Sequence, residues 1–318
     1  MIKNEKKVRM ILDTDIGDDV DDALALALAL KSPVIDLLGV TTVYKNTALR
    51  AQLAKRLAIV LGRPDLTVCS GTGMPLVNQV DCTDIPPQWT ALDESARTDT
   101  LYSSIHGVDF ILETVGKYPD LTIVTVGPLT NIACCIQKDP EAMRQTQIVV
   151  MGGMTTNAYR ESNINCDPEA ARLVFESGAD ITLVSLDTTI SCKLEKADMR
   201  RILESDHPDI HFLANLMEIW RDTFYAGFLS QWGKKIENKF DFGVGMHDPM
   251  TVMYTLAPHL FEIKDAEILV ETRGEYTRGV TVDSMNVFLG TPTGNNCHLV
   301  VKADQTAIAA LFIKTIFG

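Results

Sequence analysis

The sequence predicts an α/β fold: an open, mostly parallel sheet flanked by helices, with a mixed edge. Three observations predict it. Short apolar runs rich in β-branched residues alternate with helix-like segments through the first 190 residues, which is typical of βαβ units. Polar clusters follow several of these runs, as in folds that bind ligands at the carboxyl ends of parallel strands. Beyond residue 261, apolar and polar residues alternate between Gly and Asn, which indicates hairpins at a sheet edge.

The length and composition are those of one large globular domain. The chain has 318 residues, 46% of them hydrophobic, and no internal repeat or linker, so we expect a single domain over residues 1–318. Its net charge of −13 makes nucleic acids and anionic membranes poor partners. Without a bilayer-length apolar stretch or a leader pattern, we expect a cytoplasmic protein. The seven cysteines are scattered, which argues against a zinc site or a disulfide framework.

The expected elements follow one another in order. A strand over residues 8–12 leads through an acidic turn into an Ala/Leu-rich helix over residues 23–30. Further strands are expected at residues 35–43, 66–69, 121–126, 148–151 and 181–186. Further helices are expected at residues 47–61, 108–117, 131–137, from 168 onward, at 196–232 with a break near 205–208, at 250–256 and at 306–317. Residues 71–100 and 154–166 read as loops.

The acidic turn holds six aspartates within ten residues: Asp13, Asp15, Asp18, Asp19, Asp21 and Asp22. Like charges repel, and a bound cation is the simplest reason to gather them. Oxygen ligands favour a hard ion, Ca²⁺ or Mg²⁺. The alternative is that Asp18 and Asp19 cap the helix, at about 1 kcal/mol each. An EF-hand is excluded, because its glycine and glutamate positions hold Asp18 and Leu24 when counted from Asp13.

Polar clusters after other predicted strands are expected at the same edge of the sheet. They are Asn46, Val126 with Gly127, Glu161 to Asn163, and His247 with Asp248. Each has an ordinary explanation when taken alone. Asp248 has the residue type of a helix N-cap, with Pro249 at the first helical position, and Glu161 and Asn163 have the types of solvated turn residues. His106, beside Gly107, is explained equally well as a residue at the end of a helix.

These residues and their neighbours carry a resemblance that covers most of the chain. The motifs are Asp13-Thr14-Asp15-Ile16-Gly17 with Asp21-Asp22-Ala23, Thr41-Thr42-Val43 with Asn46, His106-Gly107, Gly127-Pro128-Leu129-Thr130-Asn131-Ile132-Ala133, Met151-Gly152-Gly153, Glu161-x-Asn163-Ile164 with Asp167-Pro168-Glu169-Ala170, His247-Asp248-Pro249 and Thr277-Arg278-Gly279. In this combination and order, the sequence resembles the inosine-uridine-preferring nucleoside hydrolase family. The resemblance implies hydrolysis of the N-glycosidic bond of ribonucleosides to free base and ribose, for nucleoside salvage.

The resemblance also implies roles for individual residues. One Ca²⁺ would be held by Asp15, Asp22, the backbone carbonyl of Val126, and Asp248, with water and the ribose hydroxyls completing its shell. Asp15 would act as general base on the bound water. The substrate side would be formed by Asp21, Asn46 and Asn163 at the ribose hydroxyls, Glu161 toward the 5′-hydroxyl, His106 near the base, and His247 as leaving-group acid. A homodimer or homotetramer is implied as well.

The chain departs from the family pattern in two places. The acidic loop is two residues longer, with Asp18-Asp19-Val20 where many members have a single residue, so either aspartate is an alternative ligand. Residues 155–160 are shorter than usual, and Asn157 is the candidate for an asparagine at the 5′-hydroxyl. The preference for purine or pyrimidine bases stays open. Four aromatic residues have two alternative roles, either stacking on the base or packing in the core. They are Trp220, Tyr225, Phe228 and Trp232.

Two other functions are consistent with parts of the pattern. A non-catalytic nucleoside or sugar binder is expected to lose a metal aspartate, whereas Asp15, Asp22 and Asp248 are all present. An Asp-x-Asp phosphohydrolase needs a lysine and a Ser or Thr at later strand ends. Those ends carry glycines and Glu161 here, which is a poor setting for a phosphate. Hydrolysis of another N-riboside remains an alternative to a nucleoside.

Overall fold

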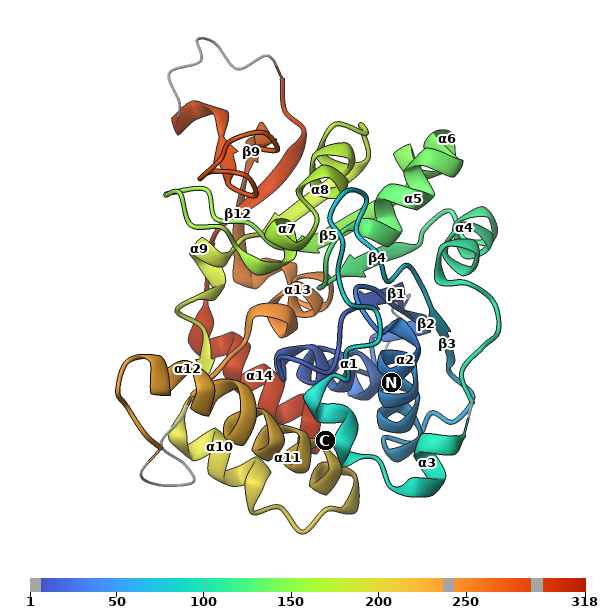
Figure 1. Cartoon of the computed structure of the whole chain (residues 1–318), viewed down its shortest axis with the longest axis vertical. Helices are drawn as coiled ribbons and strands as arrows, with labels where there is room; N and C mark the ends of the chain where they lie inside the picture. Colours follow the sequence, from blue (N-terminus) through green and yellow to red (C-terminus); the bar gives the residue numbers. More distant parts are fainter. Residues whose placement is uncertain (1–6, 100, 237–242, 287–293) are drawn as a thin grey trace, which may run out of the picture.

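The computed structural model describes residues 7–99, 101–236, 243–286 and 294–318. Its centre is an eight-stranded sheet whose neighbouring strands run parallel except at one edge, where the last pair is antiparallel. Figure 1 shows the sheet between two groups of helices. In spatial order the strands are β3 (Thr67–Ser70), β2 (Ile35–Thr42), β1 (Val8–Thr14), β4 (Thr122–Thr125), β5 (Gln147–Met151), β6 (Asp180–Val184), β12 (Cys297–Ala303) and β9 (Phe261–Ala266).

Strand β1 is buried on both faces, as a strand in a helix-covered parallel sheet must be. Met10 and Leu12 belong to the apolar core on one face of the sheet, and Ile11 belongs to the core on the other. Along β1, Asp13 is in register with Thr41 of β2 and Thr125 of β4. The carboxyl ends of these three strands therefore lie side by side, and the loops that follow them meet at one edge of the sheet.

Helices cover both faces of the sheet (Figure 1). The first face is packed by α1 (Asp21–Lys31), α2 (Thr47–Val60), α11 (Pro208–Trp220), α13 (His247–Leu256) and α14 (Gln305–Phe317). The second face is packed by α4 (Gly107–Lys117), α5 (Thr130–Lys138), α6 (Pro140–Arg144) and α8 (Pro168–Phe175).

Helix α1 is an interior helix. Residues 21–29 are all buried, because the helix is enclosed by α2, α11, α13 and α14. The run of Ala and Leu that makes this helix apolar on all sides suits such a position, since an interior helix has no solvent face to keep polar.

The remaining elements are short. Two small antiparallel pairs are formed by β7 (Lys193–Leu194) with β8 (Val244–Gly245), and by β10 (Ile268–Val270) with β11 (Thr281–Asp283). The short helices are η1 (Pro87–Ala91), α3 (Glu94–Thr98), α7 (Ser162–Cys166), α9 (Leu186–Thr189), α10 (Lys196–Leu203), a π-helical turn η2 (Arg221–Tyr225), α12 (Ala226–Gln231), η3 (Pro258–Leu260) and η4 (Ser284–Asn286).

The predicted fold class is confirmed, and the predicted strands and helices are present with ends shifted by a few residues. Two stretches predicted as loops contain short helices, α3 and α7. The tail forms the expected antiparallel pair of β9 with β12, but β12 itself joins the sheet parallel to β6. Residues 287–293 of that tail lie outside the described residues. Within the described ranges, no helix combines the length and apolarity that crossing a membrane requires.

Candidate active site

Three buried aspartates from two distant segments form the centre of the site. The carboxylates of Asp21, Asp22 and Asp248 each offer an oxygen, and these oxygens lie within 4.8 Å of one another. Asp21 and Asp22 open α1, and Asp248 lies in the first turn of α13, which packs against α1. Two helix N-termini therefore meet here, and both favour negative charge. We call these three residues the aspartate cluster.

Hydrogen bonds hold the aspartate cluster in place. The backbone N–H of Asp248 donates to the Asp21 carboxylate. The buried hydroxyl of Thr14, the last residue of β1, donates to Asp22 Oδ1 and accepts from the N–H of Ile16 at 3.1 Å. The strand and both helices therefore orient the carboxylates before any ligand arrives.

Burial and like charge act together on the aspartate cluster. Burial raises the pKa of Asp21, Asp22 and Asp248 well above the usual range, and their neighbouring carboxylates raise it further. A divalent cation would supply the missing counter-charge. An all-oxygen donor set suits a hard cation such as Ca²⁺ or Mg²⁺. The residues present therefore fit a bound divalent cation.

Asp15 lies at the rim of the aspartate cluster rather than among its three mutually close carboxylates. Its Oδ1 is so near Gly127 that a β-carbon on that residue would lie 2.7 Å away, which places the carboxylate directly after the ends of β1 and β4. Burial raises the pKa of Asp15 to about 7; the nearby Arg50 guanidinium opposes this shift, and Asp18 and Glu161 add to it. Without a bound cation, the Asp15 carboxylate therefore takes up a proton more readily than an exposed aspartate does.

The two additional residues of the acidic loop have structural partners. Asp18 Oδ2 accepts a hydrogen bond of 2.7 Å from Arg50, and Asp19 Oδ1 accepts one of 2.7 Å from the N–H of Val20. The N-cap of α1 is Val20, and no side chain caps it. The capping alternative is therefore wrong for Asp18, whereas the Asp19 carboxylate also accepts from the N–H of Asp21, the first residue of α1.

Glu161 and Asn163 bind the backbone just after β5 and β4, respectively. The Glu161 carboxylate accepts from the N–H groups of Gly153 and Asn163 at 2.8 Å and of Ile164 at 3.1 Å, so it ties the end of β5 to the start of α7. Asn163 Nδ2 donates to the carbonyl of Val126 at 2.8 Å. Both side chains are buried, at 4% and 8% exposure, so solvated turn positions are the wrong description for them.

His247 is held by a buried threonine. Its Nδ1 lies 2.9 Å from Thr189 Oγ1, and burial lowers its pKa to about 4. A β-carbon on Gly245 would lie 2.4 Å from His247 Nε2, so only glycine leaves room for the ring. The N-cap of α13 is Met246, without a side-chain cap, and Asp248 lies inside the first turn. The alternative that Asp248 serves as the N-cap is therefore wrong.

Asn46 and His106 both cap helices. Asn46 Oδ1 accepts from the N–H of Leu49 at 3.3 Å at the start of α2, and His106 Nδ1 accepts from that of Val108 at 3.3 Å at the start of α4. The helix-end position considered for His106 is thus confirmed, and its proximity to a base stays a prediction. The turn before Asn46 is strained, because Tyr44 (φ 67°) and Lys45 (φ 54°) are both left-handed.

The aromatic residues of the 220–232 segment divide into two groups. Trp220 is 5% exposed and stacks on Tyr225 at 5.2 Å between ring centroids, so these two rings pack with the core. Phe228 and Trp232 are exposed. Asn157 is also exposed, and its Oδ1 accepts from the N–H of Tyr159 at 2.8 Å.

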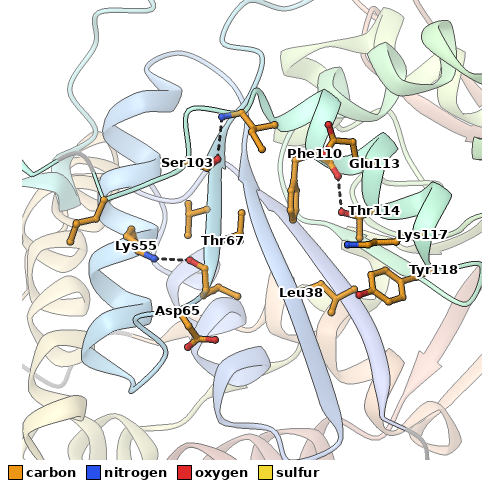
Figure 2. Close-up of a pocket in the computed structure, with 14 residues that line it drawn as sticks. Leu38, Lys55, Asp65, Thr67, Ser103, Phe110, Glu113, Thr114, Lys117 and Tyr118 are labelled. Atoms are coloured by element: carbon orange, nitrogen blue, oxygen red, sulfur yellow. Dashed lines mark hydrogen bonds between the residues drawn. The ribbon is translucent and has the colours of Figure 1, made fainter.

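A separate hollow of about 460 Å³ lies beside edge strand β3, between α2 and α4. Figure 2 shows Lys55 and Phe110 on opposite sides of it. The Lys55 ammonium is occupied there by the carbonyl oxygens of Pro64 at 2.8 Å and Leu66 at 2.7 Å. None of the residues predicted to act on a nucleoside lines this hollow.

Four contributors to the site were missed from the sequence: Thr14, Arg50, Gln88 and Thr189. Thr14 lies inside the acidic motif and was available from its position between two aspartates. Arg50 is a charged residue in an Ala/Leu-rich helix, and its 1% exposure follows only from the contacts it makes. Gln88 and Thr189 carry no local signal, because their partners are distant in sequence.

Comparisons with known proteins give the site its context. The family model described as "Inosine-uridine preferring nucleoside hydrolase" matches residues 10–310. The chain is 32% identical over 317 residues to the pyrimidine-specific ribonucleoside hydrolase RihA of Enterobacter sp. (strain 638), covering 96% of each chain. It is 32% identical over 294 residues to uridine nucleosidase 1 of Arabidopsis thaliana, covering 85% of this chain and 80% of the relative.

Solved structures agree with these relatives. The purine-preferring ribonucleoside hydrolase from Gardnerella vaginalis superimposes with a TM-score of 0.78 at 28% identity, covering 97% of this chain and 98% of the other. The chain described here belongs to the inosine-uridine preferring nucleoside hydrolase family and is a hydrolase of ribonucleosides.

Proposed function

We propose that this enzyme hydrolyses the N-glycosidic bond of ribonucleosides with Ca²⁺ at the aspartate cluster and Asp15 as the general base. The observation that carries the proposal is the burial of three carboxylates within 4.8 Å of one another beside a fourth, at the carboxyl edge of the sheet. Such a group is expensive to bury without a cation. The family membership supports the reaction class.

The proposed metal ligands are Asp15, Asp22, the carbonyl oxygen of Val126, and Asp248. Asp22 and Asp248 already lie together in the aspartate cluster, and Asp15 lies beside Gly127, the residue after Val126. The Val126 carbonyl accepts one hydrogen bond from Asn163, and a second lone pair of that oxygen remains for a cation. When bound, Ca²⁺ would orient a water molecule and favour its deprotonation.

The ribose would be bound by hydrogen-bond acceptors that the fold already orients. Asp21, Asn46 and Asn163 are assigned to its hydroxyls. Because Asn163 Nδ2 is engaged with Val126, its Oδ1 is the atom that would accept from a ribose hydroxyl. Glu161 is assigned to the 5′ side, and its bonds to three backbone N–H groups keep its carboxylate fixed there.

The negative charge of this pocket would favour cleavage of the N-glycosidic bond. Asp15 takes a proton from water, and the oxygen then attacks C1′ as the base departs. Positive charge develops on the sugar ring, where the surrounding carboxylates stabilise it. His247 is assigned to the leaving base, with Nδ1 held by Thr189 so that Nε2 serves as the donor. His106 is proposed near the base.

The named relatives include a pyrimidine-specific enzyme and a purine-preferring one, so the base has to be found by assay. The test is release of reducing sugar from inosine, uridine, cytidine and adenosine, with 2′-deoxyuridine as control and a chelated sample beside each. We expect release that requires both the metal and the 2′-hydroxyl. Release that is unaffected by exhaustive chelation would remove Ca²⁺ from the proposal. If the protein binds the metal but releases ribose from none of these nucleosides, nucleoside hydrolysis would be replaced by a binding role or by hydrolysis of another N-riboside.

The proposal extends to assembly and location. We propose a cytoplasmic homodimer or homotetramer that acts on a small-molecule nucleoside and binds neither nucleic acid nor membrane. The net charge of −13 supports the last two points, since it repels polyanions.

A further inference from the structure

The acidic loop of residues 15–20 lies between two buried polar side chains that the proposed mechanism does not use. One is Arg50 of α2, at 1% exposure, and the other is Gln88 of η1, at 0% exposure. Burying a guanidinium or a carboxamide is unfavourable unless its hydrogen bonds are satisfied by fixed partners. The hydrogen-bond partners of Arg50 and Gln88 therefore indicate what the two buried side chains stabilise.

The guanidinium of Arg50 donates hydrogen bonds to several backbone carbonyl oxygens. Its Nη1 donates to the carbonyl oxygens of Asp15 and of Ile16, the latter at 3.0 Å. Its Nε donates to the carbonyl of Tyr44 at 2.9 Å, and its Nη2 donates to Asp18 Oδ2 at 2.7 Å. The planar fork of arginine reaches acceptors in several directions, which a lysine ammonium on a flexible stem does less well. Arg50 thus fixes the backbone at Asp15 itself.

Gln88 holds the same loop from the other side. Its Nε2 donates to the carbonyl oxygens of Asp18 at 3.2 Å and Asp19 at 2.6 Å, and its backbone N–H donates to that of Gly17 at 3.0 Å. Its Oε1 is buried without a hydrogen-bond partner. Gln88 therefore binds the loop through both its side-chain amide and its backbone N–H.

The two contacts explain how the longer loop stays ordered. Asp18 and Asp19 are the additional residues, and they are the ones that Arg50 and Gln88 contact. Gly17, with φ at +127°, brings the loop so close to the segment before η1 that a β-carbon would lie 2.7 Å from Pro86 Cβ. The loop is therefore fixed on both sides of the bend that follows Asp15.

We propose that Arg50 and Gln88 are positioning residues that aim the Asp15 carboxylate at the reacting water. This inference rests on the proposed function, because it needs Asp15 to be the general base. A shift of about 1 Å in a catalytic group lowers a rate by about 100-fold. Loss of either side chain should therefore lower kcat, while KM for the nucleoside changes much less, since both side chains donate their hydrogen bonds to backbone carbonyls and to Asp18.

The test compares R50M, R50K and Q88L with a control variant, R56M. Arg56 lies on the same helix, and its Nη2 lies 3.5 Å from the exposed carboxylate of Asp93. We expect kcat to fall by about 100-fold in R50M and about 10-fold in Q88L, with partial recovery in R50K.

The outcomes separate this inference from the function it rests on. An inactive wild-type enzyme that binds Ca²⁺ overturns the proposed function. An active wild type with R50M and Q88L both within threefold of its kcat overturns the positioning role alone. If R50M does not fold, Q88L and R50K decide. An equal loss of melting temperature and of active fraction, with kcat per folded molecule unchanged, would show a merely structural clamp.

Discussion

The aspartate cluster should make the metal-free protein less stable than a variant that lacks one of its carboxylates. The change is Asp248→Asn, which keeps the size of the side chain and removes one charge. Asp248 faces Asp21 and Asp22, with the nearest oxygens within 4.8 Å. At an effective dielectric constant of about 20, two unit charges no more than 4.8 Å apart repel by about 3 kcal/mol or more.

The expected stabilisation is smaller than this repulsion. The raised pKa values mean that the metal-free cluster already relieves part of it by binding protons. We therefore expect a gain of about 2 kcal/mol in the free energy of unfolding, which corresponds to a rise of about 4 °C in Tm. In excess Ca²⁺ the order should reverse, because Asp248→Asn removes one charged ligand and so loses stabilisation by the bound ion.

The assay is thermal unfolding in chelator and across a calcium titration. Asp206→Asn serves as the control, since it removes one exposed carboxylate elsewhere. The wild type should gain Tm steeply with Ca²⁺, and Asp248→Asn should gain little. A chelated Asp248→Asn protein that melts below the chelated wild type would refute the argument from repulsion, and equal calcium affinity in both would remove Asp248 from the ligands.

Three substitutions test the other roles by ribose release. Asp15→Asn should lower kcat by about 1,000-fold with an unchanged circular dichroism spectrum, and near wild-type turnover would exclude Asp15 as the base. Gly127→Ala should lower kcat by at least about 10-fold, because its β-carbon would lie 2.7 Å from Asp15 Oδ1, whereas Gly116→Ala, in open space, should not. Thr189→Val should slow nucleosides by about 10-fold but spare a riboside with a phenolate leaving group, which needs no proton from His247; equal slowing of both would contradict this.

The fold was predictable where local pattern and final environment agree. The first strand and α1 are examples, since an apolar run and an Ala/Leu segment are what a buried strand and an interior helix require. The insertion of β12 between β6 and β9 was not predictable, because alternation marks a strand but does not name its neighbour. The choice of partner depends on contacts made by the whole sheet.

The candidate site was predictable as a set of residue types and less so as geometry. The acidic loop and His247-Asp248 were both recognised as chemistry-bearing. That Asp21, Asp22 and Asp248 form the mutually close group depends on how α1 and α13 pack together. The partners of Asp18 and Asp19 were hidden for the same reason, because Arg50 and Gln88 come from segments 32 and 69 positions away.

The burial of α1 limits which parts of this enzyme can accept substitutions. Asp22, one of the proposed metal ligands, belongs to a helix whose residues 21–29 are all buried, so we expect its backbone amides to exchange with solvent only when the whole molecule opens. Exposed Phe228 and Trp232 lie on a segment with far fewer such constraints. Substitutions on that exposed segment should therefore be tolerated more readily than substitutions in α1, where each change disturbs the packed core.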